Sequence, residues 1–554
     1  MSARHPFAAR YAAELRSGAL SRREFLTRVT ALGLTPAAAY ALGGFAPAAA
    51  QEPIPADAAP GDRILRIQQE VRPLVDPRTA DWSEIANVYR GWLEYLVENQ
   101  ADGTLRGMLL EGWEVNADAT GYVLRIRPGV TWTTGQPFNA EDVLRLFDYW
   151  CDSSVAGNVM SASLASLVDS DSGKLIEGAV RARDELTVEI ALPHPDATLI
   201  VALSDYPAAC VPPRFDPATM LSAPVGTGPF LPVEVTPGSR AILVRDTQHV
   251  WWGNTAPDFG PVGLDRIDFV DLGTDPASWI AAAKAGAIDM LYENVGPFIE
   301  AADGIGWQRS EVTTGATLVL RGNQTAEISG RKPYAEPKVR RALQRAISNE
   351  ICLELGYDNR GEVAADHHVS PIQPDYADIG PAPFAPETAP VLIAEAGFED
   401  LEHEVVTLDD GIARATGEAI VALLVDAGIR AKQVVLPGSR FWAGWKSFPL
   451  SVTEWNHRPL GIQTLNLAYR SGAVWNESGY ANPAFDAALD RALSLADAAE
   501  RSAVMAELER MLRLDAVIVQ PFWRKLFRHY RPGVTGAEMH PSFELHLYKL
   551  GLAD

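Results

Sequence analysis

Residues 112–150, GWEVNADATGYVLRIRPGVTWTTGQPFNAEDVLRLFDYW, carry the pattern that decides the fold of this 554-residue chain. Residues 122–127 follow the two-residue period of a half-buried strand, and Pro128-Gly129 then breaks that period as a turn does. A short partner strand is predicted at residues 130–132. The stretch therefore predicts three strands separated by turns, followed by a helix.

The helix that follows has a clear start. Asn139 is placed to cap it, with Asp142 three residues later, and Phe138 and Val143 have the spacing of a hydrophobic staple. The helical period then predicts one buried face, made of Val143, Leu146, Phe147 and Trp150. Further along, helical spacing also predicts a helix over residues 85–96, and the first strand of the body is predicted at Ile64 to Gln68.

Length, composition and charge limit what the chain can be. With 554 residues, 47% of them hydrophobic, it can bury more than one core, so at least two domains are expected. Beyond the N-terminal segment no run of 18 uncharged apolar residues occurs, so a soluble body is expected. The formal net charge of -23 argues against nucleic acid and against anionic lipid as partners.

Residues 1–50 are predicted to be a targeting segment. Ser21-Arg22-Arg23-Glu24-Phe25-Leu26 resembles the twin-arginine export motif, and a weakly apolar run leads to Ala48-Ala49-Ala50, where cleavage is expected. A short membrane anchor is the alternative, although the run contains several Pro and Gly residues. Residues 51–60 are expected to be a linker, and the absence of Cys near the cleavage point favours a freely diffusing protein of a Gram-negative periplasm.

The deciding stretch resembles one protein family, the extracytoplasmic solute-binding proteins of peptide and nickel ABC importers, family 5. The residues that match its signature are Trp113, Tyr122, Leu124, Ile126, Arg127, Gly129, Val130, Trp132, Gly135, Pro137, Phe138, Ala140, Glu141, Asp142 and Val143. Residues 224–230, 336–347 and 482–486 resemble later segments of the same family, so the likeness extends from residue 64 to about 530.

This resemblance implies a large two-lobed α/β periplasmic binding protein of the peptide-receptor type (type II) with an inserted subdomain. The first lobe would consist of residues 61–92, 222–312 and 525–554, the subdomain of residues 93–221, and the second lobe of residues 313–524. A receptor of this kind would deliver its solute to an ABC permease whose ATPase is a separate chain. A monomer without a cofactor is expected.

The resemblance also indicates where the solute binds. In Trp455-Asn456-His457-Arg458, a strand runs into a loop at the place where relatives carry a Trp and an Asp that face the cleft, and Asn323 ends a strand that in relatives lies near the ligand. Arg458 stands where those relatives have Asp, which pairs with a ligand ammonium group. We therefore expect Arg458 to prefer an acidic group, unless it pairs with a protein carboxylate such as Glu454.

Other functions have less support in the sequence. The sequence contains no G-x-S-x-G, H-E-x-x-H, C-x-x-C or P-loop motif, so no enzyme is expected, and a secreted hydrolase and a chaperone-like protein remain as alternatives. Asp366-His367-His368 is the one tight metal-like cluster, but adjacent His side chains rarely face the same ion, so no metal site is expected. Cys151 and Cys210 could form a bridge, or all three cysteines, with Cys352, could be buried thiols. The solute could be a peptide, an opine, a sugar conjugate or a metal chelate.

Overall fold

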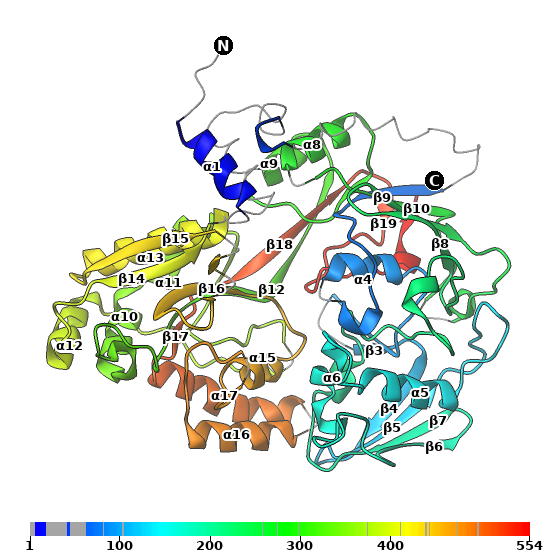
Figure 1. Cartoon of the computed structure of the whole chain (residues 1–554), viewed down its shortest axis with the longest axis horizontal. Helices are drawn as coiled ribbons and strands as arrows, with labels where there is room; N and C mark the ends of the chain where they lie inside the picture. Colours follow the sequence, from blue (N-terminus) through cyan, green and yellow to red (C-terminus); the bar gives the residue numbers. More distant parts are fainter. Residues whose placement is uncertain are drawn as a thin grey trace.

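The structure is a computed structural model, and it describes residues 6–17, 41–44, 63–80, 82–101, 105–256, 259–273, 275–296, 298–373, 375–409, 411–437, 440–441, 444–473, 475–495 and 498–553. These residues form a two-lobed α/β molecule, with the second lobe on the left of Figure 1 and the first lobe on the right. A short helix, α1 (Pro6–Arg16), precedes both lobes. The twin-arginine pair and the expected cleavage point at Ala50 lie outside the described residues. Among the described helices, none is both long enough and apolar enough to cross a membrane.

One large sheet runs through both lobes. In spatial order its strands are β15 (Ala431–Leu436), β14 (His403–Leu408), β16 (Leu450–Trp455), β12 (Gln308–Gly322), β18 (Phe522–Tyr530), β11 (Met290–Leu291), β1 (Ile64–Gln68), β10 (Arg266–Val270), β9 (Arg240–Arg245) and β8 (Phe230–Thr236). Two further strands lie off this path, β13 (Gly361–Val363) beside β18 and β17 (Ile518–Val519) beside β12.

Each lobe has its own group of parallel strands. In the first lobe β1 pairs in parallel with β10 and β11, and in the second lobe β14 pairs in parallel with β15 and β16. The bounds of β1 are those predicted from the sequence. The helices of the first lobe are α4 (Ser83–Tyr89), α8 (Pro276–Lys284) and α9 (Phe298–Asp303). Those of the second lobe are α10 (Pro337–Ala346), α11 (Asn349–Tyr357), α12 (Ala389–Ala396), α13 (Gly411–Asp426), α15 (Gly461–Ala468), α16 (Pro483–Leu493) and α17 (Ala498–Leu514).

The antiparallel strands β12 and β18 connect the two lobes through the middle of the molecule (Figure 1). Residues 308–313 of β12 pair with residues 525–530 of β18, whereas residues 317–322 of β12 pair with β16 of the second lobe. Between these two parts the register with β18 shifts, which marks a bulge at residues 313–317. The hydroxyl of Thr314 stabilises this bulge, because it donates a hydrogen bond to the carbonyl oxygen of Arg524 over 2.8 Å.

The deciding stretch builds a separate four-stranded sheet with the order β4 (Leu110–Val115), β5 (Gly121–Ile126), β7 (Thr187–Ala191) and β6 (Val180–Asp184). The predicted helix is α5 (Ala140–Trp150). The Asn139 side chain accepts from the backbone N–H groups of Glu141 and Asp142, and the Asp142 carboxylate accepts from the N–H of Asn139. The predicted apolar face of α5 is fully buried, so both the cap and the face are confirmed.

Two local predictions were wrong. Residues 130–132 form a single isolated bridge, between Thr131 and Pro137, because the chain turns back over too few residues to form a ladder. The helix predicted over 85–96 is α4, which starts at Ser83 and ends at Tyr89. Beyond Arg90 the carbonyl oxygens of Gly91 and Trp92 accept from the backbone N–H groups of Phe230 and Gly228, so they bond outside a helix. The aromatic residues that follow, Trp92 and Tyr95, are buried in the core as expected.

Candidate functional site

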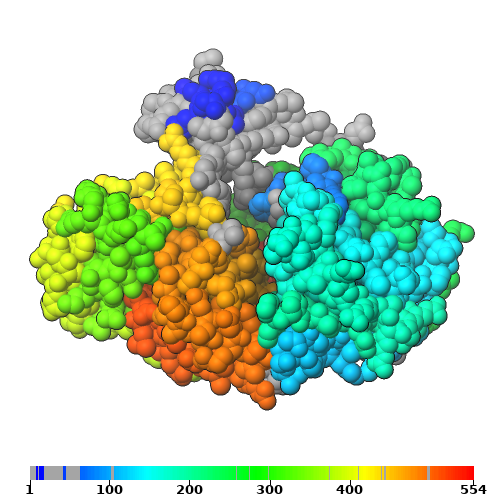
Figure 2. Space-filling view, turned by 60° about the horizontal axis from the view of Figure 1, so that its bottom comes forward, coloured from blue at the N-terminus to red at the C-terminus, as the bar shows by residue number. Residues whose placement is uncertain are grey.

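The segment Trp455–Arg458 lies at the carboxyl end of β16. Ligands of open α/β sheets bind in the crevice beyond the carboxyl ends of the parallel strands. The segment also lies near the inserted subdomain, because the charge of Arg458 acts on Asp205, which follows α7 (Leu199–Ala202), and the apolar cluster of Trp455 extends to Val201 in α7. The backbone N–H of Ala197 donates to the carbonyl oxygen of Leu493 in α16 over 3.1 Å. In Figure 2 these parts, α16 and α17 in orange and the subdomain in cyan to green, meet along a narrow seam.

Trp455 is held in place by a buried carboxylate. Its indole N–H donates to Glu477 over 2.8 Å, and the other Glu477 oxygen accepts from Nε of Arg321 and from the hydroxyl of Thr453, each over 2.9 Å. The guanidinium of Arg321 is fully buried, and it donates further to the carbonyl oxygens of Phe448 and Trp445. This network fixes the indole plane, and no local pattern predicts it because Glu477 and Arg321 are 156 residues apart.

Aromatic rings surround Trp455 on two sides. The ring of His368 lies 5.3 Å from it, and the ring of Trp475 lies 6.1 Å away in an edge-to-face arrangement. Trp475 keeps 39% of its surface exposed, which is unusual for so large an apolar side chain. Trp475 therefore provides an open aromatic face next to the predicted binding segment.

The guanidinium of Arg458 packs against that face. Its guanidinium carbon lies 5.4 Å from the centre of the Trp475 ring, a cation–π arrangement. The alternative pairing with Glu454 is not formed, because Glu454 bonds to Arg524 of β18 instead. Within the part of the chain that the structure describes, Arg458 has no carboxylate within 4 Å. Its charge interacts electrostatically with the Asp205 carboxyl of the inserted subdomain. Burial raises the pKa of the Asp205 carboxyl, and the Arg458 cation opposes this rise.

The remaining predicted residues differ in their surroundings. Asn456 is exposed, whereas His457 is buried and accepts a hydrogen bond at Nδ1 from the backbone N–H of Gly315 over 3.0 Å. Asn323 is buried and fully engaged with protein groups. Its amide nitrogen donates to the carbonyl oxygen of Lys446 over 3.1 Å, and its oxygen accepts from the N–H and the hydroxyl of Thr325. The structure thus brings Trp455 and Arg458 together and gives Asn323 the role of holding a neighbouring loop.

The metal-like cluster does not converge on one point. Nδ1 of His367 lies 3.9 Å from a carboxylate oxygen of Glu509, whereas Nδ1 of His368 lies 3.0 Å from the hydroxyl of Tyr469. The two imidazoles therefore face different parts of the second lobe. Among the described residues a different group, His540, Glu544 and His546, has its ligand atoms within 4.8 Å of one another.

That group is a hydrogen-bonded network and poorly suited to a cation. His540 uses both of its ring nitrogens, one toward the carbonyl oxygen of Asn99 and the other toward the N–H of Ser542. Glu544 lies 2.9 Å from the guanidinium of Arg90, which already supplies a positive charge at this place. The three cysteines, Cys151, Cys210 and Cys352, are all buried free thiols, so the suggested Cys151–Cys210 bridge is absent.

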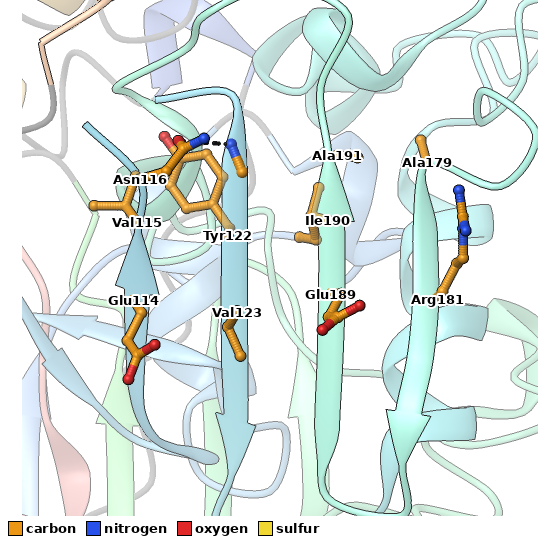
Figure 3. A pocket seen from close by; sticks show the side chains of 11 residues that line it. Glu114, Val115, Asn116, Tyr122, Val123, Ala179, Arg181, Glu189, Ile190 and Ala191 are labelled. Carbon is orange, nitrogen blue, oxygen red and sulfur yellow. Dashed lines mark hydrogen bonds between the residues drawn. The ribbon is translucent and has the colours of Figure 1, made fainter. Parts of the chain in front are cut away.

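A hollow of about 470 Å³ lies far from these residues, on the outer face of the four-stranded sheet (Figure 3). Small residues, Gly121, Ala179 and Ala191, are among those that line it. Two of its carboxylates are paired, Glu114 with Arg125 and Glu189 with Arg183, and Nε of Arg181 donates to the carbonyl oxygen of Gly178. This hollow lies in a different part of the chain from the predicted binding segment.

Comparison with known proteins agrees with the fold and with the class. The chain is 25% identical over 480 residues to the heme-binding protein A of Haemophilus influenzae, covering 80% of this chain and 84% of that protein. It is 24% identical over 493 residues to the periplasmic oligopeptide-binding protein OppA of Salmonella typhimurium, covering 83% and 87%. A solved structure of AgaA from A. tumefaciens R10 in complex with agropinic acid superimposes with a TM-score of 0.69 at 20% identity, covering 89% of this chain and 99% of that one. The model of the bacterial extracellular solute-binding proteins, family 5 middle, matches residues 104–476, and the chain belongs to this family of solute-binding proteins.

Proposed function

We propose that this protein captures a peptide or another amino-acid-derived solute between its lobes in the periplasm and delivers it to an ABC permease with a separate ATPase. Family membership supports a role as a binding receptor and not as an enzyme. The relatives whose names mention heme, oligopeptides and agropinic acid indicate that one fold serves chemically different solutes. An opine, a sugar conjugate or a metal chelate is therefore the second candidate solute, and a secreted hydrolase is the alternative from another class.

The contacts of the Arg458 side chain are the observation that supports an acidic solute. Its guanidinium rests on the half-exposed Trp475 ring, and Glu454, its nearest acidic neighbour along the chain, is occupied by Arg524. A guanidinium presents a planar fork of donors that suits a carboxylate. We propose that Arg458 binds an acidic group of the solute, with Trp455 as an apolar wall and Asn456 at the rim. A hydrogen bond to a charged group contributes roughly 1.5–3 kcal/mol.

The proposed mechanism is closure of the lobes about β12 and β18. The register shift in β12 begins at Thr313, which pairs with Lys525 of β18, and this supports a hinge near the proposed lobe boundaries. Arg524 supports this hinge, because it bonds Glu454 of the second lobe and lies 3.7 Å from Glu293 of the first lobe. We further propose a monomer without a cofactor, exported by the twin-arginine route with cleavage near Ala50.

The test starts with native mass spectrometry of protein purified from its own periplasm, which identifies a retained solute by its mass. Calorimetric titration of that solute and of its amidated form then compares wild type with Arg458→Ala. We expect amidation and the substitution each to weaken binding by at least tenfold, which is about 1.4 kcal/mol. Arg414→Ala is the matched control, since Arg414 is exposed and pairs with Glu418 on α13. Affinities that stay within twofold for both changes would exclude an acidic group at Arg458, and turnover of the solute would favour a hydrolase.

A further inference from the structure

His457 is held in one tautomer by the strand that connects the lobes. Its Nδ1 atom lies 3.0 Å from the backbone nitrogen of Gly315 in β12, and both groups are buried. A backbone N–H can only donate, so Nδ1 must be the acceptor and carry no proton. The proton of the neutral ring is therefore on Nε2.

The Nε2–H group has no acceptor among the residues that the structure describes, although the atom is buried. The charged or titratable groups that act on the ring are Arg458 in its own loop and His540 and Glu544 near the C-terminus. Burial is the main cause that lowers the pKa of His457 to about 3; His540 and Arg458 act in the same direction, and Glu544 opposes them. The ring is thus a neutral donor at physiological pH, and a buried donor without a partner is costly to keep.

The bulge in β12 explains why the Gly315 N–H is free to bind a side chain. The register shift between Thr313 and Thr317 leaves Gly315 outside the ladder that β12 forms with β18. The hydroxyl of Thr314 accepts from the N–H of Ala316 over 3.0 Å and so keeps the bulge in this shape. The buried N–H of Gly315 then needs another acceptor, and Nδ1 of His457 supplies it.

Three polar side chains approach Gly315 closely, which favours a glycine at this position. A Cβ on Gly315 would lie 3.1 Å from Nδ1 of His457, 3.3 Å from the hydroxyl of Ser370 and 3.6 Å from the amide nitrogen of Gln373. That amide nitrogen donates to the carbonyl oxygen of Arg458 over 2.6 Å. Gly315 therefore controls the position of His457 directly and borders the contact that holds the backbone of Arg458.

We infer that the bulge of β12 holds His457 as a fixed hydrogen-bond donor whose acceptor is an oxygen atom of the bound solute, with Gly315 as the positioning residue. This inference rests on the proposed function and adds to it a second recognition group beside Arg458. Arg458 selects for negative charge, whereas a neutral N–H selects for an acceptor of any charge, such as a peptide carbonyl. A solute that places an N–H group here would face a donor and would be rejected.

Two substitutions separate the role of the Nδ1 acceptor of His457 from that of its Nε2–H donor. In His457→Asn the amide oxygen can take the place of Nδ1 and accept from Gly315, but no donor remains at the position of Nε2. In His457→Gln the amide nitrogen can take the place of Nε2, but the acceptor for Gly315 is lost. With trialanine as the probe, we expect the Asn variant to keep the melting temperature of the wild type and to bind about tenfold more weakly. We expect the Gln variant to melt at a lower temperature and to bind within threefold of the wild type. The same substitutions at the exposed His194 are the control, and they should change neither quantity.

A measurement on the ligand-free protein tests the tautomer without any solute. In protein labelled with ¹⁵N-histidine, the His457 signal, assigned from its loss in the Asn variant, should show a protonated Nε2 and an unprotonated Nδ1 from pH 5 to pH 8. Gly315→Ala should shift this signal, and Gly112→Ala, which has open space around its Cβ, should not. A proton on Nδ1, or an ordinary titration near pH 6.5, would overturn the inference, as would equal affinities of the Asn and Gln variants for trialanine. If wild type does not bind trialanine, the peptide proposal fails, whereas the labelled histidine still decides whether the bulge holds a donor.

Discussion

The buried ion pair behind Trp455 gives a quantitative prediction. Arg321 exposes none of its side chain and Glu477 exposes only 4%, and the Glu477 carboxylate accepts three hydrogen bonds. Glu477→Ala would leave the guanidinium of Arg321 buried without its counter-charge. Removing one partner of such a pair typically costs about 3–5 kcal/mol, so we expect the free energy of unfolding to fall by about this amount. Urea denaturation followed by far-UV circular dichroism measures the loss.

A double-mutant cycle separates the ion pair from simple loss of volume. Arg321→Met alone leaves Glu477 unpaired, whereas the double variant with Glu477→Ala has no buried charge left, so its loss should be at least about 2 kcal/mol smaller than the sum of the single losses. The exposed pair of Arg414 and Glu418 on α13 is the matched control, and Glu418→Ala should change stability by less than about 0.5 kcal/mol. A loss below about 1 kcal/mol for Glu477→Ala, or additive single losses, would refute this account of how Trp455 is positioned.

Three further predictions follow from buried groups. Burial raises the pKa of Glu509 to about 9, so the protonated side chain stabilises the folded state below pH 4.5, and this stabilisation is lost as pH rises toward 9. In thermal melts, Glu509→Gln should be more stable than the wild type at pH 8 but not at pH 4. Burial lowers the pKa of His403 to about 4, so the unfolded state takes up its proton first and stability falls as pH drops from 6.5 to 4; His403→Gln should flatten this acid limb by about 1.4 kcal/mol per pH unit. Cys151, Cys210 and Cys352 should resist a maleimide in the native protein and react with three equivalents in guanidinium, and fewer than three would mean that a disulfide exists.

Local signals in the sequence predicted local structure well. The Asn139 cap, the buried face of α5 and the bounds of β1 depend on residues that are close in sequence, and all three are confirmed. The family pattern identified the fold class because its motifs are spread over most of the chain, and the family model matches residues 104–476. The failure at residues 85–96 has the opposite cause, because the helical period continues there while the carbonyl oxygens of Gly91 and Trp92 bond to the distant residues Phe230 and Gly228.

The contacts within the candidate site could not be predicted in the same way. The bond between Gly315 and His457 joins residues 142 positions apart, and it exists only because a bulge turns one backbone N–H out of its ladder. No residue type in a single sequence predicts a bulge of this kind. Glu477 and Arg321 are likewise separated by 156 positions, and their meeting depends on how the loop before Pro483 packs against β12 and β16.

The case of Arg458 shows why distance along the chain misleads at such a site. Glu454 is four residues earlier, and on a helix that spacing would place the two side chains together. Glu454 lies in β16, however, where successive side chains alternate between faces, and Arg458 lies in the loop beyond the strand. The Glu454 face of β16 is opposite to that of Trp455, and there the partner is Arg524 of β18, 70 positions away. Glu454 therefore pairs with Arg524 of β18 at the hinge. The positive charge of Arg458 is not neutralised by Glu454, and it lies beyond the end of β16, where the two lobes meet.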